Sequence, residues 1–276
     1  MAKIRRKSQV VSLQPPVSSL RSTSRNNFLK FLGTAGARFV MIKQMRASGG
    51  IWVSCQGTNV IVDPGPGSIV RINASKPKLD PSSLDGIILT HRHLDHSGDV
   101  NVMIEAMTEG GFKKRGIVFC PQDALGEDPV ILKHAFGFPE RIEIIEAGKK
   151  YNVGNFEFEA SARHIHPVET YGLRFNLNQT SIALLSDTRY FKELVDFYKV
   201  DILIIGVVFF EPRPGIDHLC LDDAKFIISQ IKPKRAIMTH FGMTMLQNKP
   251  HILAQKMSVE LGVTVEAAYD GMTVDF

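Results

Sequence analysis

The chain has 276 residues, of which 44% are apolar and 22% are charged, and it carries a net charge of +5. This composition is ordinary for a globular protein and excludes a wholly disordered chain, a collagen-like chain and a coiled coil. A membrane span is excluded as well, because the longest uncharged apolar stretch (residues 202–210) is less than half of the roughly twenty residues that a spanning helix needs. The three cysteines lie far apart and form neither a disulfide framework nor a metal knuckle, so we expect a reducing compartment, the cytoplasm.

The positive charge is concentrated near the N-terminus. Residues 1–62 contain ten lysines and arginines and no acidic residue, which leaves 23 positive and 28 negative charges, a net of −5, in the remaining 214 residues. The net charge is therefore weak support for a nucleic-acid partner. Residues 1–27 are also rich in Ser and Pro and poor in large apolar side chains, and we expect a basic, disordered tail there. A targeting segment or a start codon placed too early would give the same composition.

From residue 28 onward, apolar runs rich in β-branched residues are separated by clusters of Gly, Pro, Asn and Asp, a pattern typical of strands and turns. These runs predict strands at residues 28–32, 50–55, 58–62, 86–89, 116–119, 142–145, 156–161, 172–175, 181–185, 202–207 and 236–238. The early runs follow one another through short turns, whereas the later ones alternate with helical patterns such as residues 222–231. We expect one domain, residues 28–276, of mixed sheets with outer helices.

A dense group of polar residues follows the predicted strand 86–89. It consists of His91, His93, Asp95 and His96. Three histidines and a carboxylate packed so closely are costly to desolvate without a cation, and the histidines repel one another when protonated. Imidazole and carboxylate without thiolate suit zinc, with manganese or iron as alternatives. His91 and His93 can hold one cation, and Asp95 and His96 can hold a second.

Three further residues of ligand type lie where an apolar strand stops. His166 follows strand 156–161, Asp187 follows strand 181–185, and His240 follows strand 236–238. Each of them alone is about as well explained by a capping or surface role. Together they complete the set of ligands that a two-metal site needs. His164 is the alternative to His166 in the same segment.

These residues, in this order, resemble the metallo-β-lactamase superfamily. The resemblance runs from Phe28 to the C-terminus and includes Leu-Gly-Thr-Ala-Gly-Ala at 32–37, Val-Asp-Pro-Gly at 62–65 and Thr-His-Arg-His-Leu-Asp-His-Ser-Gly-Asp at 90–99. It also includes the three later residues of ligand type. The resemblance implies an α/β fold, a four-layer αββα sandwich of two mixed sheets with a dinuclear metal site at one edge.

The resemblance also implies a role for each residue. His91, His93 and His166 would hold the first metal ion, Asp95, His96 and His240 the second, and Asp187 would bridge the two ions, which would be Zn²⁺ or else Mn²⁺. His166 is preferred to His164 because its spacing to Glu169 and Gly172 resembles that of the family's segment. Asp63 would be a structural carboxylate near the site, or simply the cap of an Asp-Pro-Gly turn.

Within the superfamily, residues 33–37 and 166–174 resemble the phosphodiesterase branch, which includes ribonuclease Z and cyclic phosphodiesterases of phosphonate metabolism. This implies hydrolysis of a nucleotide-like or RNA-end phosphodiester. Asp95 would orient the attacking water or accept its proton, and His218 would protonate the leaving alkoxide. His218 is equally well explained as a polar residue at a helix N-terminus. Only 21 positions separate His166 from Asp187, which leaves no room there for the tRNA-binding arm of ribonuclease Z.

Other functions share this fold or these ligands. A carboxyl-ester, thioester or lactone hydrolase is the main alternative, because metal ligands are common to all these chemistries. A di-iron oxygen or nitric-oxide reductase is disfavoured by His93, where such proteins usually carry Glu. The complete set of ligands disfavours a non-catalytic metal-holding or nucleic-acid-binding protein. The resemblance also allows a homodimer, and no motif indicates a membrane partner.

Overall fold

The computed structural model describes residues 27–276, so the predicted basic tail, apart from Asn27, lies outside the described residues. Asn27 is 3% exposed. Its side-chain oxygen accepts a hydrogen bond from the Gln56 N–H at 2.7 Å, and its backbone oxygen accepts one from the Phe276 N–H at 2.9 Å. Asn27 is therefore packed into the body of the protein. Between residues 27 and 276, no helix is both long and apolar enough to cross a membrane.

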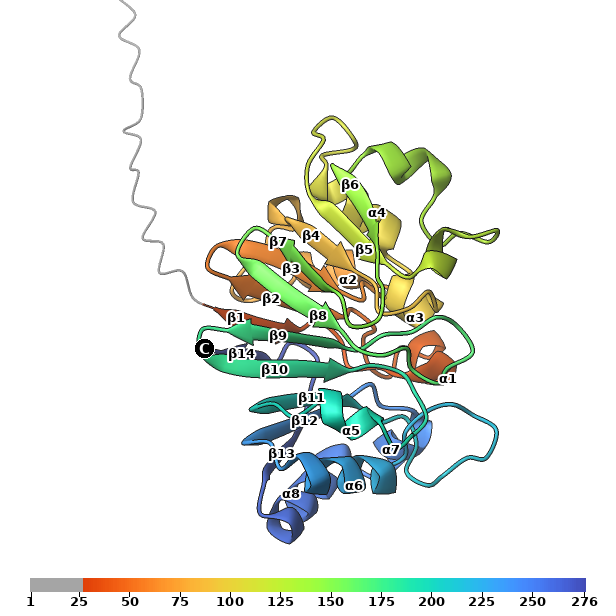
Figure 1. Cartoon of the computed structure of the whole chain (residues 1–276), viewed down its shortest axis with the longest axis vertical. Helices are drawn as coiled ribbons and strands as arrows, with labels where there is room; N and C mark the ends of the chain where they lie inside the picture. Colours follow the sequence, from red (N-terminus) through yellow and green to blue (C-terminus); the bar gives the residue numbers. More distant parts are fainter. Residues whose placement is uncertain (1–26) are drawn as a thin grey trace, which may run out of the picture.

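Two seven-stranded sheets form the body of the molecule (Figure 1). The first has the order β14 (Thr273–Asp275), β1 (Phe28–Phe31), β2 (Ile51–Cys55), β3 (Thr58–Val62), β4 (Gly86–Ile88), β5 (Ile117–Cys120) and β6 (Arg141–Ile144). The second has the order β13 (Thr264–Ala267), β12 (Arg235–Thr239), β11 (Ile202–Gly206), β10 (Thr180–Leu185), β9 (Leu173–Leu177), β8 (Phe156–Ala160) and β7 (Lys150–Val153). Both sheets contain parallel and antiparallel pairs, so the prediction of two mixed sheets is confirmed.

Helices cover the outer faces of the two sheets. The first sheet packs against α2 (Ser68–Asn73) and α4 (Val100–Met107), and the second against α5 (Leu194–Phe197), α6 (Leu221–Ile231), α7 (Met243–Gln247) and α8 (Pro250–Leu261). Strand β2 shows how the sequence separates the layers. Val53 faces the core between the sheets, whereas the preceding residue, Trp52, faces the outer layer of helices. This is expected because successive side chains of a strand point to opposite faces. The predicted αββα sandwich is confirmed.

Three strands of the structure are not among those predicted from the sequence. They are β7, β13 and β14, and each lies at the edge of its sheet. In β7, the exposed Lys150 and Asn152 alternate with the buried Tyr151 and Val153. A strand with one solvated face alternates in this way. The alternating strands β8 and β9 each carry three buried residues, whereas β7 carries two and β13 and β14 carry one each, so the edge strands give a weaker apolar signal.

The carboxyl ends of several strands meet at one edge of the sandwich. Strand β3 ends just before Asp63, β10 two residues before Asp187, and β12 just before His240. The loop after β4 leads into the short helix α3 (Leu94–Ser97), which lies beside α1 (Ala37–Ile42) at the same edge (Figure 1). The remaining described helices are single 3₁₀ turns, η1 (Pro81–Ser83), η2 (Gln122–Leu125) and η3 (Lys133–Gly137). The fold therefore gathers polar strand ends at a single edge.

Candidate metal centre

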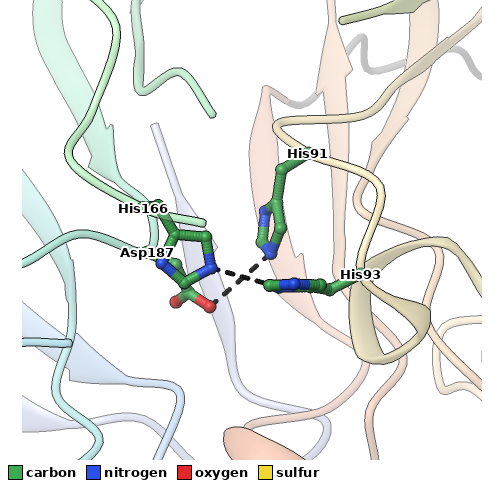
Figure 2. A group of neighbouring side chains, drawn as sticks. All are labelled: His91, His93, His166 and Asp187. Carbon is green, nitrogen blue, oxygen red and sulfur yellow. Dashed lines mark hydrogen bonds and ion pairs between the residues drawn. The ribbon is translucent and has the colours of Figure 1, made fainter. Parts of the chain in front are cut away.

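All seven residues singled out as ligands in the sequence meet at this edge, in two groups. The first group is His91, His93, His166 and Asp187, and the second is Asp95, His96 and His240. Within each group, every residue offers one nitrogen or oxygen atom, and these atoms lie within 4.8 Å of one another. Figure 2 shows the three rings and the carboxylate of the first group converging on a common space. The two sheets contribute jointly, since the first group combines residues from the loops after β4, β8 and β10.

The backbone at two of the strand ends is left-handed, which is uncommon for residues other than glycine. Asp63 has φ = 53° and His240 has φ = 57°. Such conformations cost free energy and cluster at functional sites. His240 is also packed closely against Gly36, where a Cβ atom would lie 2.1 Å from the His240 carbonyl oxygen. The glycine is required there by the approach of the two backbones.

In His166 and His96, the ring nitrogen that faces away from the centre, Nδ1, is held by a hydrogen bond. Nδ1 of His166 lies 3.0 Å from the backbone oxygen of Asp217, which can only accept, so this nitrogen carries the proton. Nδ1 of His96 lies 2.9 Å from a carboxylate oxygen of Asp63. In a neutral imidazole the other nitrogen then presents a lone pair. Both Nε2 atoms face another imidazole nitrogen of the cluster, His93 Nδ1 at 3.1 Å and His240 Nε2 at 2.9 Å, respectively.

Nε2 of His91 is a nitrogen of the cluster that is available to bind a cation. The Thr90 hydroxyl donates to Asp63 at 2.7 Å, so its oxygen is free to accept from Nδ1 of His91 at 3.1 Å. Nε2 of His91 then carries a lone pair. This nitrogen is buried, has no hydrogen-bond partner among residues 27–276, and lies 3.6 Å from a carboxylate oxygen of Asp187. A buried nitrogen of this kind is expensive unless it binds something. The residues present therefore fit a cation.

Burial and charge set the protonation of the histidines. Burial lowers the pKa of His91 well below its ordinary value, and His96 adds to this effect. Burial, together with His166, lowers the pKa of His93 to about 4. The pKa of His96 instead rises well above its ordinary value, because the carboxylates of Asp95, Asp63 and Asp187 outweigh the effect of burial. The same carboxylates favour a metal cation at this position.

Asp187 belongs to the first group but also lies close to histidines of the second. One of its carboxylate oxygens lies 3.6 Å from His91 Nε2 and 3.5 Å from His96 Nε2, and the other lies 3.3 Å from His240 Nδ1. Although burial raises the pKa of Asp187, the histidines around it, His240, His218 and His96, hold it well below the usual range. A buried, ionised carboxylate in contact with both groups has the position expected of a bridging ligand.

The two remaining histidines of the sequence analysis have different surroundings. His218 lies at the edge of the cluster, with Nδ1 3.6 Å from a carboxylate oxygen of Asp187 and its ring 5.1 Å from that of His166. His164 is 3% exposed and belongs to neither group. Its ring nitrogens contact the Tyr198 hydroxyl at 2.6 Å and the Asp187 backbone oxygen at 3.1 Å.

Several contributors are not marked by the sequence pattern. Asp217 acts through its backbone oxygen, so its side chain gives no signal. Tyr198 is 34 positions from its partner His164 and lies among residues of mixed polarity at the end of α5. Thr90 is a small polar residue between a strand and a histidine, and only the contact with Asp63 reveals its role.

Comparisons with known proteins agree with this geometry. The sequence model of the Beta-lactamase superfamily domain matches residues 58–241. An uncharacterized protein of Methanocaldococcus jannaschii, MJ1374, is 32% identical over 254 residues, which cover 89% of this chain and 93% of the relative.

Solved structures with the same fold are more distant in sequence. The metallo-β-lactamase fold protein YhfI from Bacillus subtilis has a TM-score of 0.74 at 19% identity, covering 91% of this chain and 100% of that one. A diphosphatase from the PhnP family has a TM-score of 0.66 at 21% identity, with 91% and 97% covered. The short form of human tRNase Z has a TM-score of 0.63 at 17% identity, with 90% and 98% covered. At these identities, the likeness establishes the fold.

Proposed function

Because the chain belongs to the metallo-β-lactamase superfamily, we propose that its histidine and aspartate cluster holds two divalent metal ions and hydrolyses phosphodiesters. The first ion is held by His91, His93 and His166, the second by Asp95, His96 and His240, and Asp187 is shared between them. Nitrogen and carboxylate ligands without thiolate favour Zn²⁺, with Mn²⁺ as the alternative.

Two bound ions lower the pKa of water towards neutrality and neutralise charge on a phosphoryl oxygen. The protein contributes oriented ligands and a carboxylate. Asp95 lies 3.4 Å from His240 Nε2 and 3.7 Å from His96 Nε2 through the same carboxylate oxygen. Burial raises its pKa, but His96 and His240 outweigh burial and lower it. Asp95 is therefore ionised and orients the attacking water by accepting a hydrogen bond.

The observation that carries the phosphodiester assignment is the position of His218. This imidazole belongs to neither group of candidate ligands. Its Nδ1 is buried, has no hydrogen-bond partner in the part of the chain that the structure describes, and lies 3.6 Å from a carboxylate oxygen of Asp187. Burial lowers its pKa, and the Asp187 carboxylate opposes that effect. An anionic diester in the site adds negative charge and favours the protonated ring. His218 then supplies the proton that an alkoxide leaving group needs.

The length of the chain between His166 and Asp187 supports a small substrate. Strands β9 and β10 form an antiparallel hairpin that occupies most of this segment. No arm extends from the segment to hold a folded RNA at a distance from the site. We therefore favour a small cyclic or linear nucleotide-like diester over an RNA end.

The proposal is tested with two diesters that differ in leaving group. The reconstituted protein is assayed on bis(p-nitrophenyl) phosphate, whose p-nitrophenolate leaves readily without a proton, and on a 2′,3′-cyclic nucleotide, whose alkoxide does not. His218→Asn should lower kcat by about 10²- to 10⁴-fold on the cyclic nucleotide, the usual range for a lost general acid, and far less on the nitrophenyl diester. His251→Ala, on the exposed surface of α8, is the matched control and should change neither rate.

Equal losses on both diesters would show that His218 is not the acid. Hydrolysis of a lactone, a carboxyl ester or a thioester without hydrolysis of either diester would replace the phosphodiesterase proposal by the main alternative.

A further inference from the structure

His164 is a buried histidine that the proposed reaction does not use. It lies two positions before His166, but it points away from the cluster. Its Nδ1 lies 3.1 Å from the backbone oxygen of Asp187, and its Nε2 lies 2.6 Å from the hydroxyl of Tyr198. Both the histidine and the tyrosine are almost completely buried, at 3% and 0% exposure.

The two contacts fix the direction of both hydrogen bonds. A backbone oxygen can only accept, so Nδ1 of His164 carries the proton and donates it to Asp187. In a neutral imidazole, Nε2 is then an acceptor, and the Tyr198 hydroxyl donates to it. The result is a directed chain from Tyr198 through His164 to the backbone of Asp187.

The space for the tyrosine hydroxyl is made by a glycine. A Cβ atom on Gly172 would lie 1.7 Å from the Tyr198 oxygen, so no other residue at position 172 is compatible with this placement. The end of α5, the start of β9 and the segment before His166 therefore meet at one hydroxyl group. A buried network whose hydrogen bonds are all made in this way restricts each of its side chains to one conformation.

The carboxylate of Asp187 lies within 3.3–3.6 Å of histidines from both groups of candidate ligands, so its position bears on both. We propose that His164 and Tyr198 are positioning residues that hold the backbone of Asp187 so that its carboxylate reaches both metal positions. This inference rests on the proposed two-metal function. It assigns His164 a role different from that of the ligand His166.

Metal affinity of the apoprotein, measured by competition with a chelator, tests the proposal without any activity assay. Tyr198→Phe removes only the hydroxyl, and His164→Leu removes both hydrogen bonds. Partners of metal ligands typically contribute 10- to 100-fold in affinity, so we expect a loss of about 10-fold for the first variant and up to about 100-fold for the second. His164→Asn retains an amide N–H near the position of Nδ1 and should recover most of the affinity. Tyr190→Phe, whose ring packs against Phe226, is the matched control and should bind like the wild type.

A second measurement needs no metal. The ¹⁵N–¹H correlation of the histidine side chains in the apoprotein should show His164 as the neutral tautomer with the proton on Nδ1, and Tyr198→Phe should shift its Nε2 resonance. The opposite tautomer would overturn the proposal, as would variants that lose thermal stability but bind metal as tightly as the wild type. A wild-type chain that binds no metal would refute the proposed function itself, whatever the tautomer.

Discussion

A carboxylate oxygen of Asp63 lies 2.9 Å from Nδ1 of His96, and the same side chain accepts hydrogen bonds from the backbone N–H and the hydroxyl of Thr90, both at 2.7 Å. Asp63 follows strand β3 and Thr90 follows β4, so the contact joins two neighbouring strand ends. It also directs Nε2 of His96 towards the second group of candidate ligands. The Asp-Pro-Gly turn is therefore part of the site's framework.

Substitution of this carboxylate should weaken the second metal position. In Asp63→Asn, the side chain keeps its size but loses the charge that fixes the proton on His96 Nδ1. We expect the affinity for the weaker-bound metal equivalent to fall by about 10- to 100-fold, with little change in the other. Chelator competition measures both equivalents. Asp85→Asn, which alters an acceptor for the Asn59 N–H at the start of β3, is the control. If Asp63→Asn lowered the affinity for both metal equivalents equally, the carboxylate of Asp63 would not act through His96 alone.

The three cysteines should be inert in the native protein. Cys55, Cys120 and Cys220 are buried and free. Burial raises the pKa of Cys120 to about 12 and that of Cys220 to about 11, so neither thiol forms an appreciable thiolate at neutral pH, and the thiolate is the reactive species. A disulfide reagent such as Ellman's should react slowly with the native chain and release about three equivalents after unfolding. Rapid release of one equivalent from the native chain would contradict this burial.

Acidification should destabilise the apoprotein through His164. Burial lowers its pKa to about 4 in the folded chain, against an ordinary value of 6.5. Between these values the unfolded chain binds the proton and the folded chain does not, so the free energy of unfolding is highest above pH 6.5 and falls as the pH drops towards 4. The difference amounts to roughly 3 kcal/mol. Urea unfolding of the apoprotein at pH 7 and pH 4.5 measures it.

The comparison variant for that experiment is His164→Asn, which has no titrating group at this position. Its free energy of unfolding should fall less than that of the wild type between the two pH values, by roughly 2–3 kcal/mol. An identical fall in both proteins would show that His164 does not set this dependence.

Much of the site is predictable from the sequence because each candidate ligand follows an apolar strand. Parallel strands bring their carboxyl ends to one edge of a sheet, so Asp187 and His240, which follow the parallel strands β10 and β12, are expected to meet once the strands are recognised. That His91, from the other sheet, joins them follows only from the resemblance to the two-sheet family. The choice of His166 over His164 rests on the resemblance of the segment around Glu169 and Gly172 to that of the family. In the structure, His164 contacts Tyr198 and the Asp187 backbone and belongs to neither group of candidate ligands.

Other features depend on contacts that no local pattern encodes. The pairing of His164 with Tyr198 spans 34 positions, and the tyrosine is indistinguishable in sequence from any other buried aromatic residue. The edge strands β7, β13 and β14 escape recognition because each contributes at most two buried residues to the pattern. The role of Asp217 lies in its backbone oxygen, which every residue possesses.

The metal content of the purified protein tests the central claim most directly. After reconstitution with Zn²⁺ and removal of free metal, elemental analysis should find about two equivalents per chain in the wild type and in the surface control His251→Ala. His240→Ala should retain about one equivalent, because the first group of ligands remains intact. A wild-type chain that folds but retains no metal after reconstitution would contradict the two-metal account.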